Sequence, residues 1–430
     1  MRYLPIDRNL FMLNRKNFCK QLYPKSVAIF NSNDIMPTNA DGSMPFRQNS
    51  DLLYLSGIDQ EESILILFPD HPDEKMRELL FLRETNEEIA IWEGHKYTKS
   101  EATEISGIQN ILWLSQFGAT LNALIAEAEH IYLNTNEHSR RPLTEVETRD
   151  SRFIKWCKER YPLHQYHRAA PILYNLRMIK SDIEIDILQK ACDITESGFR
   201  RILPFVKPGV YEYEIEAELI HEFIRNRSGG FAYAPIIATG FNACVLHYIE
   251  NKDKCKDGDI LLLDIGAEYA NYNADLTRSI PVNGRYTQRQ KDVYNAVLRV
   301  QREAFSMLRP GNVIPEYHKE IGKLMESELV QLGLIDKTDI KNQDPEKPAY
   351  KKYFMHGTSH HLGLDVHDVG SMYRKFEEGM LFTVEPGIYI REENLGIRIE
   401  NDVVIQKDGI QDLMKTIPIE TDEIEELMNG

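Results

Sequence analysis

Cysteine is scarce in this 430-residue chain, which contains only five: Cys19, Cys157, Cys192, Cys244 and Cys255. They are scattered, odd in number and never spaced as Cys-x-x-Cys, a pattern that argues against a zinc knuckle and a disulfide framework. Reduced, mostly buried thiols are typical of a cytoplasmic protein, and we expect this localisation.

Long apolar segments and positive charge are also lacking. No apolar run approaches the ~18–20 residues of a membrane span, and the start of the chain, MRYLPIDR, has no apolar core or cleavage site of a signal peptide. The formal net charge of −16 argues against nucleic acid and anionic membranes as partners. Residues 1–170 contain no glycine-rich phosphate loop, so a nucleotide-binding role has little support.

The chain is long enough for two or three domains, and its apolar content of 42% is ordinary for a protein with a sizeable core. In residues 1–170 short apolar runs alternate with helical patterns, which predicts a smaller α/β domain. On composition alone, residues 45–57 are predicted to be a loop entering a strand. The other expected strands are 26–30, 63–68, 79–83 and 130–133, and residues 115–129 are an expected helix.

Residues 171–430 contain an internal repeat. A Pro-Gly pair, a helical stretch and a glycine six residues before an acid occur twice, as Pro208-Gly209 with Gly258 and Asp264, and as Pro310-Gly311 with Gly379 and Glu385. In each half a second acid follows on the returning strand. The two halves are therefore predicted to be related α+β units, each contributing one hairpin with two acids.

Capping residues and apolar spacing predict four helices in this half, and two more strands are expected after residue 368. Residues 336–348 are polar and are predicted to be an exposed loop. The helices are expected at 182–204, 212–227, 288–309 and 315–333.

The four acids Asp264, Asp275, Glu385 and Glu400 lie in or beside apolar, strand-like runs. Burying an unpaired carboxylate costs several kcal/mol or forces it to take up a proton, and acids opposed across a hairpin repel each other. Two divalent cations ~3.5–4 Å apart would neutralise four such charges.

Between these acidic pairs, four of the 13 histidines lie within twelve residues of one another: His356, His360, His361 and His367. A single acid at a strand end is usually part of a turn or salt bridge, and a lone histidine in a glycine-rich loop is usually structural. Four acids in matched positions beside a histidine cluster are harder to explain in this way, so the sequence predicts that the acids and one histidine bind two metal ions. Oxygen donors with one imidazole and no thiolate favour Mn²⁺ or Co²⁺ over structural zinc. Mn²⁺ is the first expectation, with Co²⁺ and Zn²⁺ as the alternatives.

Several motifs together resemble aminopeptidase P, a family of Xaa-Pro aminopeptidases in the M24, creatinase-like "pita-bread" superfamily. In the N-terminal half, FRQNSD (46–51) and Ile91-Trp92 resemble that family's non-catalytic first domain, which replaces the composition-based interpretation of the first of these segments. The remaining motifs are NACVLHY (242–248), DLTR (275–278), HGTSH (356–360), LGLDVHD (362–368), TVEPGIY (383–389) and GIRIE (396–400).

The resemblance covers nearly the whole chain and implies an α+β protein of two domains. Residues 1–170 would form the N-terminal α/β domain, and residues 171–430 a catalytic pita-bread domain with a pseudo-twofold internal repeat. The implied activity is hydrolysis of the bond between the N-terminal residue of a peptide and a proline in position 2.

The resemblance also implies a role for each site residue. One metal would be bound by Asp275, His360, Glu385 and Glu400, and the other by Asp264 together with the bridging Asp275 and Glu400. His361 departs from the pattern, because a tryptophan is associated with that position, and its role stays open. The substrate cleft would be lined by His247, His356 and His367, with Tyr389 and Arg398 as further substrate-binding residues.

The implied mechanism is attack of a metal-bridging hydroxide on the scissile carbonyl. His367 would stabilise the oxyanion, Glu385 would carry the proton towards the proline nitrogen, and His247 and His356 would assist in the cleft. Prolyl bonds lack an N–H and fix φ, so a pocket shaped for the ring is physically sensible.

Two alternatives stay open at this point. A prolidase would use the same metals on Xaa-Pro dipeptides, and a binding protein would keep the fold without catalysis, although here all five ligand positions are present. The expected partners are peptides with proline in position 2 and further copies of the chain in a homodimer or homotetramer. Trp92 and the first domain are expected to reach the cleft of a neighbouring subunit.

Overall fold

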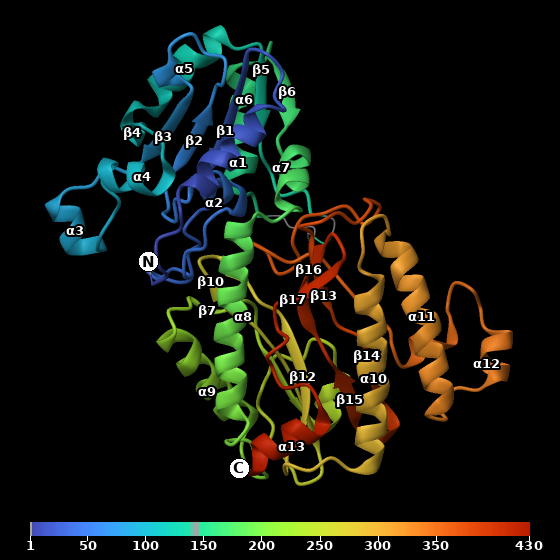
Figure 1. Ribbon diagram of the computed structural model, residues 1–430. Coiled ribbons are helices and arrows are strands. Elements are labelled where there is room, and N and C mark those ends of the chain that lie inside the picture. Colours follow the sequence, from blue (N-terminus) through green and yellow to red (C-terminus); the bar gives the residue numbers. More distant parts are fainter. Residues whose placement is uncertain (1, 139, 141–145) are drawn as a thin grey trace. The chain divides into compact units, whose positions relative to one another are not determined.

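The computed structural model describes residues 2–138, 140 and 146–430. The chain divides into two compact units, Tyr3–Arg177 and Met178–Gly430, whose elements are labelled in Figure 1. Within the described residues, no helix combines the length and apolar character needed to cross a membrane.

The N-terminal unit is built on one six-stranded sheet with the order β4-β3-β2-β1-β5-β6. β2 runs antiparallel to β1 and β3, and the other neighbouring pairs are parallel. The core forms where apolar side chains of the sheet, such as Ile29 and Ile66, pack with Leu124 of α5. The strands are β1 (Ser26–Asn31), β2 (Ile64–Leu67), β3 (Glu78–Leu82), β4 (Asn110–Trp113), β5 (His130–Leu133) and β6 (Gln165–Arg168).

The helices of this unit include α5 where a helix was expected, and the predicted α/β domain is confirmed. Its helices are α1 (Asn9–Cys19), α2 (Ser50–Ser56), α3 (Glu87–Glu93), α4 (Lys99–Ser106), α5 (Phe117–Glu127), α6 (Arg149–Arg160) and α7 (Ala170–Arg177).

The strand expected within residues 45–57 is wrong, because Ser50–Ser56 form the helix α2. Asn49 caps it by accepting hydrogen bonds from the backbone of Asp51 and Leu52, and Gly57 ends it with a φ of 70°. The apolar residues of this segment suit a strand as well as a helix. The strong N-cap and the left-handed glycine favour the helix.

In the C-terminal unit the same succession of elements occurs twice, as the internal repeat predicts. Each half has two helices, an outer antiparallel pair of strands and a small inner hairpin. In the first half these are α8 (Asp182–Ile202), α9 (Glu212–Arg225), β9 (Ile260–Ile265), β10 (Ala267–Tyr269), β11 (Tyr272–Asn273) and β12 (Leu276–Pro281). In the second they are α10 (Gln288–Met307), α11 (Ile314–Gln331), β13 (Leu381–Val384), β14 (Gly387–Ile390), β15 (Leu395–Arg398) and β16 (Asn401–Gln406).

The long helices α8 and α10 flank the strands of this unit (Figure 1), where α8 contacts β10 and α10 contacts β15. Both begin with the capping box that the sequence predicts, at Ser181 with Glu184 and at Thr287 with Gln290. The remaining elements are β7 (Gly230–Phe231), β8 (Ile236–Thr239), α12 (Lys337–Asn342), β17 (Gly409–Asp412) and α13 (Thr421–Asn429).

Two expectations for this unit need correction. The predicted loop 336–348 contains the short helix α12, because Asp336 caps it by accepting from the backbone of Thr338 and Asp339. The two strands expected after residue 368 are in fact five, followed by α13. Tight turns divide this region into shorter strands than expected, as at Asn394, which has a φ of 51° and separates β14 from β15.

Candidate metal centre and substrate cleft

The four acids lie at corresponding ends of the paired strands. Asp264 is on β9 and Asp275 directly precedes β12, its antiparallel partner. In the second half Glu385 directly follows β13 and Glu400 directly precedes β16. The backbone N–H of Glu400 donates to the carbonyl oxygen of Thr277 at 3.0 Å, which joins the two halves where the acids lie.

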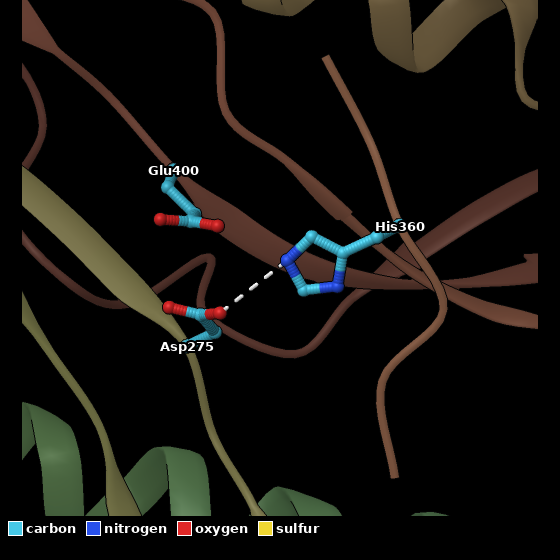
Figure 2. A group of neighbouring side chains, drawn as sticks. All are labelled: Asp275, His360 and Glu400. Carbon is cyan, nitrogen blue, oxygen red and sulfur yellow. Dashed lines mark ion pairs between the residues drawn. The ribbon is translucent and has the colours of Figure 1, made fainter. Parts of the chain in front are cut away.

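Asp275, His360 and Glu400 form a compact group in which one ligand atom of each lies within 4.8 Å of the others. Figure 2 shows the imidazole of His360 directed towards both carboxylates. Its Nε2 atom lies 3.6 Å from Oδ2 of Asp275 and 3.6 Å from Oε1 of Glu385. His360 therefore lies close to three of the predicted carboxylate ligands, Asp275, Glu385 and Glu400.

The group is buried and would be unfavourable with every acid charged. Burial raises the pKa of Asp275 well above its usual value, and the nearby charge of Asp264 adds to the effect. Burial and the charge of Asp275 raise the pKa of Glu400 in the same way. Protons or cations must therefore compensate these carboxylates, and the donor set of oxygens with one imidazole is chemically suited to divalent metal ions.

Tyr233 links the two acids of the first half. Its hydroxyl oxygen lies 2.6 Å from Oδ1 of Asp264 and 2.6 Å from Oδ1 of Asp275. A hydroxyl has one hydrogen and can donate to only one of these oxygens at a time. The second close oxygen then needs a proton or a nearby cation, and the guanidinium of Arg398 is such a cation beside Asp264.

A chain of hydrogen bonds leads from Asp264 to the histidine-rich segment. Arg398 donates from Nη2 to Oδ2 of Asp264 at 2.5 Å and from Nη1 to the hydroxyl of Tyr389 at 2.8 Å. The same hydroxyl is hydrogen-bonded to Nε2 of His356 at 2.7 Å. Burial and the positive charge of Arg398 lower the pKa of His356 to about 3, so its imidazole is neutral at physiological pH.

His356 also lies beside a predicted ligand, with its Nδ1 atom 3.7 Å from Oε2 of Glu385. His367 is exposed, and its ring centroid lies 4.4 Å from that of His360 in an edge-to-face arrangement. His247 is exposed in the turn that follows Gly240–Cys244, and its charge contributes to lowering the pKa of His356. His356 and His367 thus lie beside predicted ligands, and His247 lies close enough to His356 to influence its pKa.

His361 packs against the strand β13. Its side chain is buried, with its ring centroid 4.4 Å from that of Phe382 on β13. Its carbonyl oxygen accepts from the backbone N–H of Asp368 at 2.9 Å. His361, at which the sequence departs from the aminopeptidase P pattern, thus packs against Phe382 of β13.

The chain matches the metallopeptidase family M24 over residues 186–407. It belongs to this family. Residues 11–132 match the N-terminal domain of aminopeptidase P. The predicted α+β fold, with a pita-bread unit preceded by an α/β domain, is confirmed by these matches and by solved structures.

The M24 relatives span the chain almost completely. It is 34% identical to the Xaa-Pro aminopeptidase of Escherichia coli over 98% of both chains, and 31% identical to human Xaa-Pro aminopeptidase 3 over 92% of this chain and 78% of that one. The aminopeptidase PepP of Pseudomonas aeruginosa superimposes with a TM-score of 0.89 at 32% identity, covering 100% of this chain and 99% of that chain.

Sequence reasoning gave no role to four residues that surround this M24 centre. The Thr277 hydroxyl donates to Oε2 of Glu400 at 2.6 Å, and Nε2 of His318 accepts from the backbone N–H of Ser359 at 3.3 Å, next to His360. Tyr233 and Asp402 are the others. Only Thr277 stood in a motif; the rest come from segments with no chemical pattern of their own.

Proposed function

We propose that the protein is a metal-dependent aminopeptidase that removes an N-terminal residue preceding proline from peptides. The observation that carries the proposal is the buried group of Asp275, His360 and Glu400 in a chain of the M24 family. Relatives that align over nearly the whole chain are named Xaa-Pro aminopeptidases, which supports the same substrate class.

In this proposal two divalent ions, Mn²⁺ in the first place, are held by five residues. Asp275, His360, Glu385 and Glu400 would bind one ion, and Asp264, Asp275 and Glu400 the other. When bound, such ions lower the pKa of a water molecule and polarise a carbonyl group. The oxygen-rich donor set, with no cysteine among the ligands, is the support for manganese over structural zinc.

The other residues would act on the peptide. Glu385 lies between His360 and His356, where a carboxylate can accept a proton from water and deliver it to the departing proline nitrogen. His367, exposed beside His360, would donate a hydrogen bond to the developing oxyanion. His247 and neutral His356 would line the cleft, and Tyr389 and Arg398 would orient the substrate through the hydrogen bonds that they share with His356 and Asp264.

The test is hydrolysis of peptides with and without proline in position 2 by the purified protein, after chelation and after addition of Mn²⁺, Co²⁺ or Zn²⁺. We expect cleavage of Ala-Pro-Ala and little cleavage of Ala-Ala-Ala, with activity lost on chelation and restored by Mn²⁺. Glu385→Gln should lower kcat by about 10²–10⁴-fold, whereas the exposed Glu423→Gln on α13 is the matched control. Metal-independent hydrolysis, or an unaffected Glu385→Gln enzyme, would overturn the proposal.

The prolidase alternative is decided by substrate length. An enzyme restricted to dipeptides would cleave Ala-Pro and leave Ala-Pro-Ala intact. The full-length relatives named aminopeptidases favour the longer substrate.

We further propose a homodimer or homotetramer in the cytoplasm. Ile91 and Trp92 on α3 are 80% and 82% exposed, and none of the residues of this helix is buried, which suits a contact with another copy. All five cysteines are free thiols, as expected in a reducing compartment. Light scattering of the parent protein and of Trp92→Ala tests the assembly, and fractionation of cells tests the location.

A further inference from the structure

A pocket of about 670 Å³ opens beside the candidate centre, between α11 and the segment that precedes His360. The lining includes His356, Gly357 and Thr358, side chains from α11, and residues between Gln343 and Phe354. All its lining residues belong to the C-terminal unit. None of the roles proposed above uses this volume beyond His356.

The pocket adjoins Glu385 through its lining residues Thr358 and His356. The carbonyl oxygen of Thr358 accepts a hydrogen bond of 2.8 Å from the backbone N–H of Glu385, and the His356 ring lies 3.7 Å from the Glu385 carboxylate. A peptide advances ~3.3–3.6 Å per residue when extended. Two or three residues beyond a bond held at Glu385 would therefore reach the pocket.

Three lysines line the pocket, although the net charge of the chain is −16. Lys319 and Lys323 on α11 and Lys351 after α12 are exposed lining residues, against two glutamates, Glu326 and Glu346. Lys323 is engaged by Glu320 at 2.6 Å, which leaves Lys319 and Lys351 as the stronger attraction for an external anion. Carboxylates are the anionic groups that peptides carry.

The pocket also has a well-packed base. Phe354 is buried, and the Tyr350 ring lies so close to α11 that a Cβ added at Gly322 would come within 2.7 Å of it. Gly322 therefore leaves room for the Tyr350 side chain against the helix. The lysines thus share the lining with closely packed aromatic side chains, a mixture of groups that is common in ligand pockets.

Taking the proposed function as its basis, we infer that this pocket receives the two or three residues that follow the proline, and that its lysines select a carboxylate there. The carboxylate can belong to an acidic side chain or to the C-terminus of a short peptide. The enzyme is then a peptidase for short or acidic Xaa-Pro peptides rather than one indifferent to everything beyond proline.

The experiment measures kcat/KM of the metal-loaded enzyme on a set of peptides that differ only at the end. Ala-Pro-Ala-Ala with a C-terminal amide is the neutral reference. Ala-Pro-Ala-Glu with an amide tests the acidic side chain, the first peptide with a free C-terminus tests the terminal carboxylate, and Ala-Pro-Ala-Lys with an amide is the basic counterpart. We expect both carboxylate peptides to exceed the reference and the lysine peptide to fall below it.

Lys319→Gln and Lys351→Gln should each lower the ratio of carboxylate to neutral kcat/KM by about 1.5- to 5-fold, the range for exposed ion pairs. Higher salt should lower the ratio in the parent enzyme. Lys407→Gln, in the turn between β16 and β17, is the control and should leave the ratio unchanged.

The outcomes separate the two proposals. Suppose that all the peptides are cleaved, but the ratio of carboxylate to neutral kcat/KM is one or is unchanged by both pocket substitutions. The assignment of the pocket is then wrong, while the aminopeptidase function stands. If no Xaa-Pro peptide is cleaved in any metal, the proposed function itself fails. A response to the side-chain peptide alone assigns the pocket to acidic residues, and a response to the free C-terminus alone assigns it to short peptides.

Discussion

The backbone N–H of Asp275 donates a hydrogen bond of 2.9 Å to Oδ2 of Asp402. Asp402 is fully buried on β16, and Asp275 precedes β12, so a strand of the second half orients a predicted ligand of the first. Partners behind metal ligands typically contribute about 10–100-fold to metal affinity or activity.

We therefore expect Asp402→Ala to weaken Mn²⁺ binding by about tenfold or more, because the Asp275 N–H loses its acceptor and the ligand its orientation. Asp402→Asn keeps an acceptor and should retain most of the affinity. Isothermal titration of the metal-free proteins measures both, with circular dichroism as the check on folding. Equal losses in the two variants would show that the lost charge, rather than the hydrogen bond, is what matters.

Metal binding should stabilise the C-terminal unit more strongly as the pH rises. Burial holds the pKa values of Asp275 and Glu400 well above 3.8 and 4.5 in the absence of a cation. Between the unfolded and the raised folded pKa values the folded chain binds more protons, so the metal-free protein loses stability as the pH increases. A cation stabilises the ionised carboxylates instead. Thermal unfolding with Mn²⁺ and with a chelator, from about pH 5 to about pH 8, should show a widening difference in Tm; a constant difference would contradict this.

Asp150 gives the N-terminal unit a pH dependence of its own. Burial raises its pKa to about 7, although the side chain of Asn31 donates a hydrogen bond to it at 3.0 Å. Since the unfolded value is near 3.8, the stability of this unit should decrease as the pH rises from about 4 through about 7.

Asp150→Asn removes the ionisation, so the variant should have a higher Tm than the parent at alkaline pH and a smaller advantage near pH 5. Thermal unfolding followed at both pH values checks this, with the exposed Asp41→Asn as the control. A parent and variant that respond to pH identically would exclude Asp150 as the cause.

The ion pair of Lys180 and Asp368 fixes the segment that carries His367. The two groups are 2.9 Å apart and both side chains are 1% exposed. Removing one partner of a buried pair typically costs ~3–5 kcal/mol, since the other charge stays buried. Lys180→Met should therefore lower the free energy of unfolding by about this amount.

Replacing both partners, as Lys180→Met with Asp368→Leu, should restore much of that loss, because no uncompensated charge is left. Urea unfolding of the single and double variants provides the comparison. A double variant as unstable as the single one would mean that further interactions of Asp368, such as the hydrogen bond that it accepts from the backbone N–H of Val369 at 2.9 Å, are the larger contribution.

Much of the architecture could be predicted because its determinants are local. The capping residues Ser181 and Thr287 start the two long helices where expected, and the spacing of acids after glycines exposed the repeat. The same local reasoning failed at residues 50–56 and 337–342, where a single N-cap, Asn49 or Asp336, starts a short helix in a segment without amphipathic periodicity.

The site residues that could be predicted from the sequence are those whose side-chain chemistry differs from that of their neighbours in the chain. An acid such as Asp264 in an apolar strand is conspicuous, whereas Tyr233 and His318 are unremarkable in their own segments. Their contacts, with Asp264 and Ser359, join positions far apart in the chain. No local pattern encodes such contacts, so they become visible only when the strands are paired.

The bridge between Thr277 and Glu400 has a consequence for how the protein is made. The candidate ligands are spread from Asp264 to Glu400, and the last of them directly precedes the strand β16. During synthesis, a ribosome-bound chain that has not yet released this strand has only part of the centre. Peptidase activity would thus arise only after the strand that follows Glu400 has been made and the second half closes on the first, and a chain without this strand would stay inert.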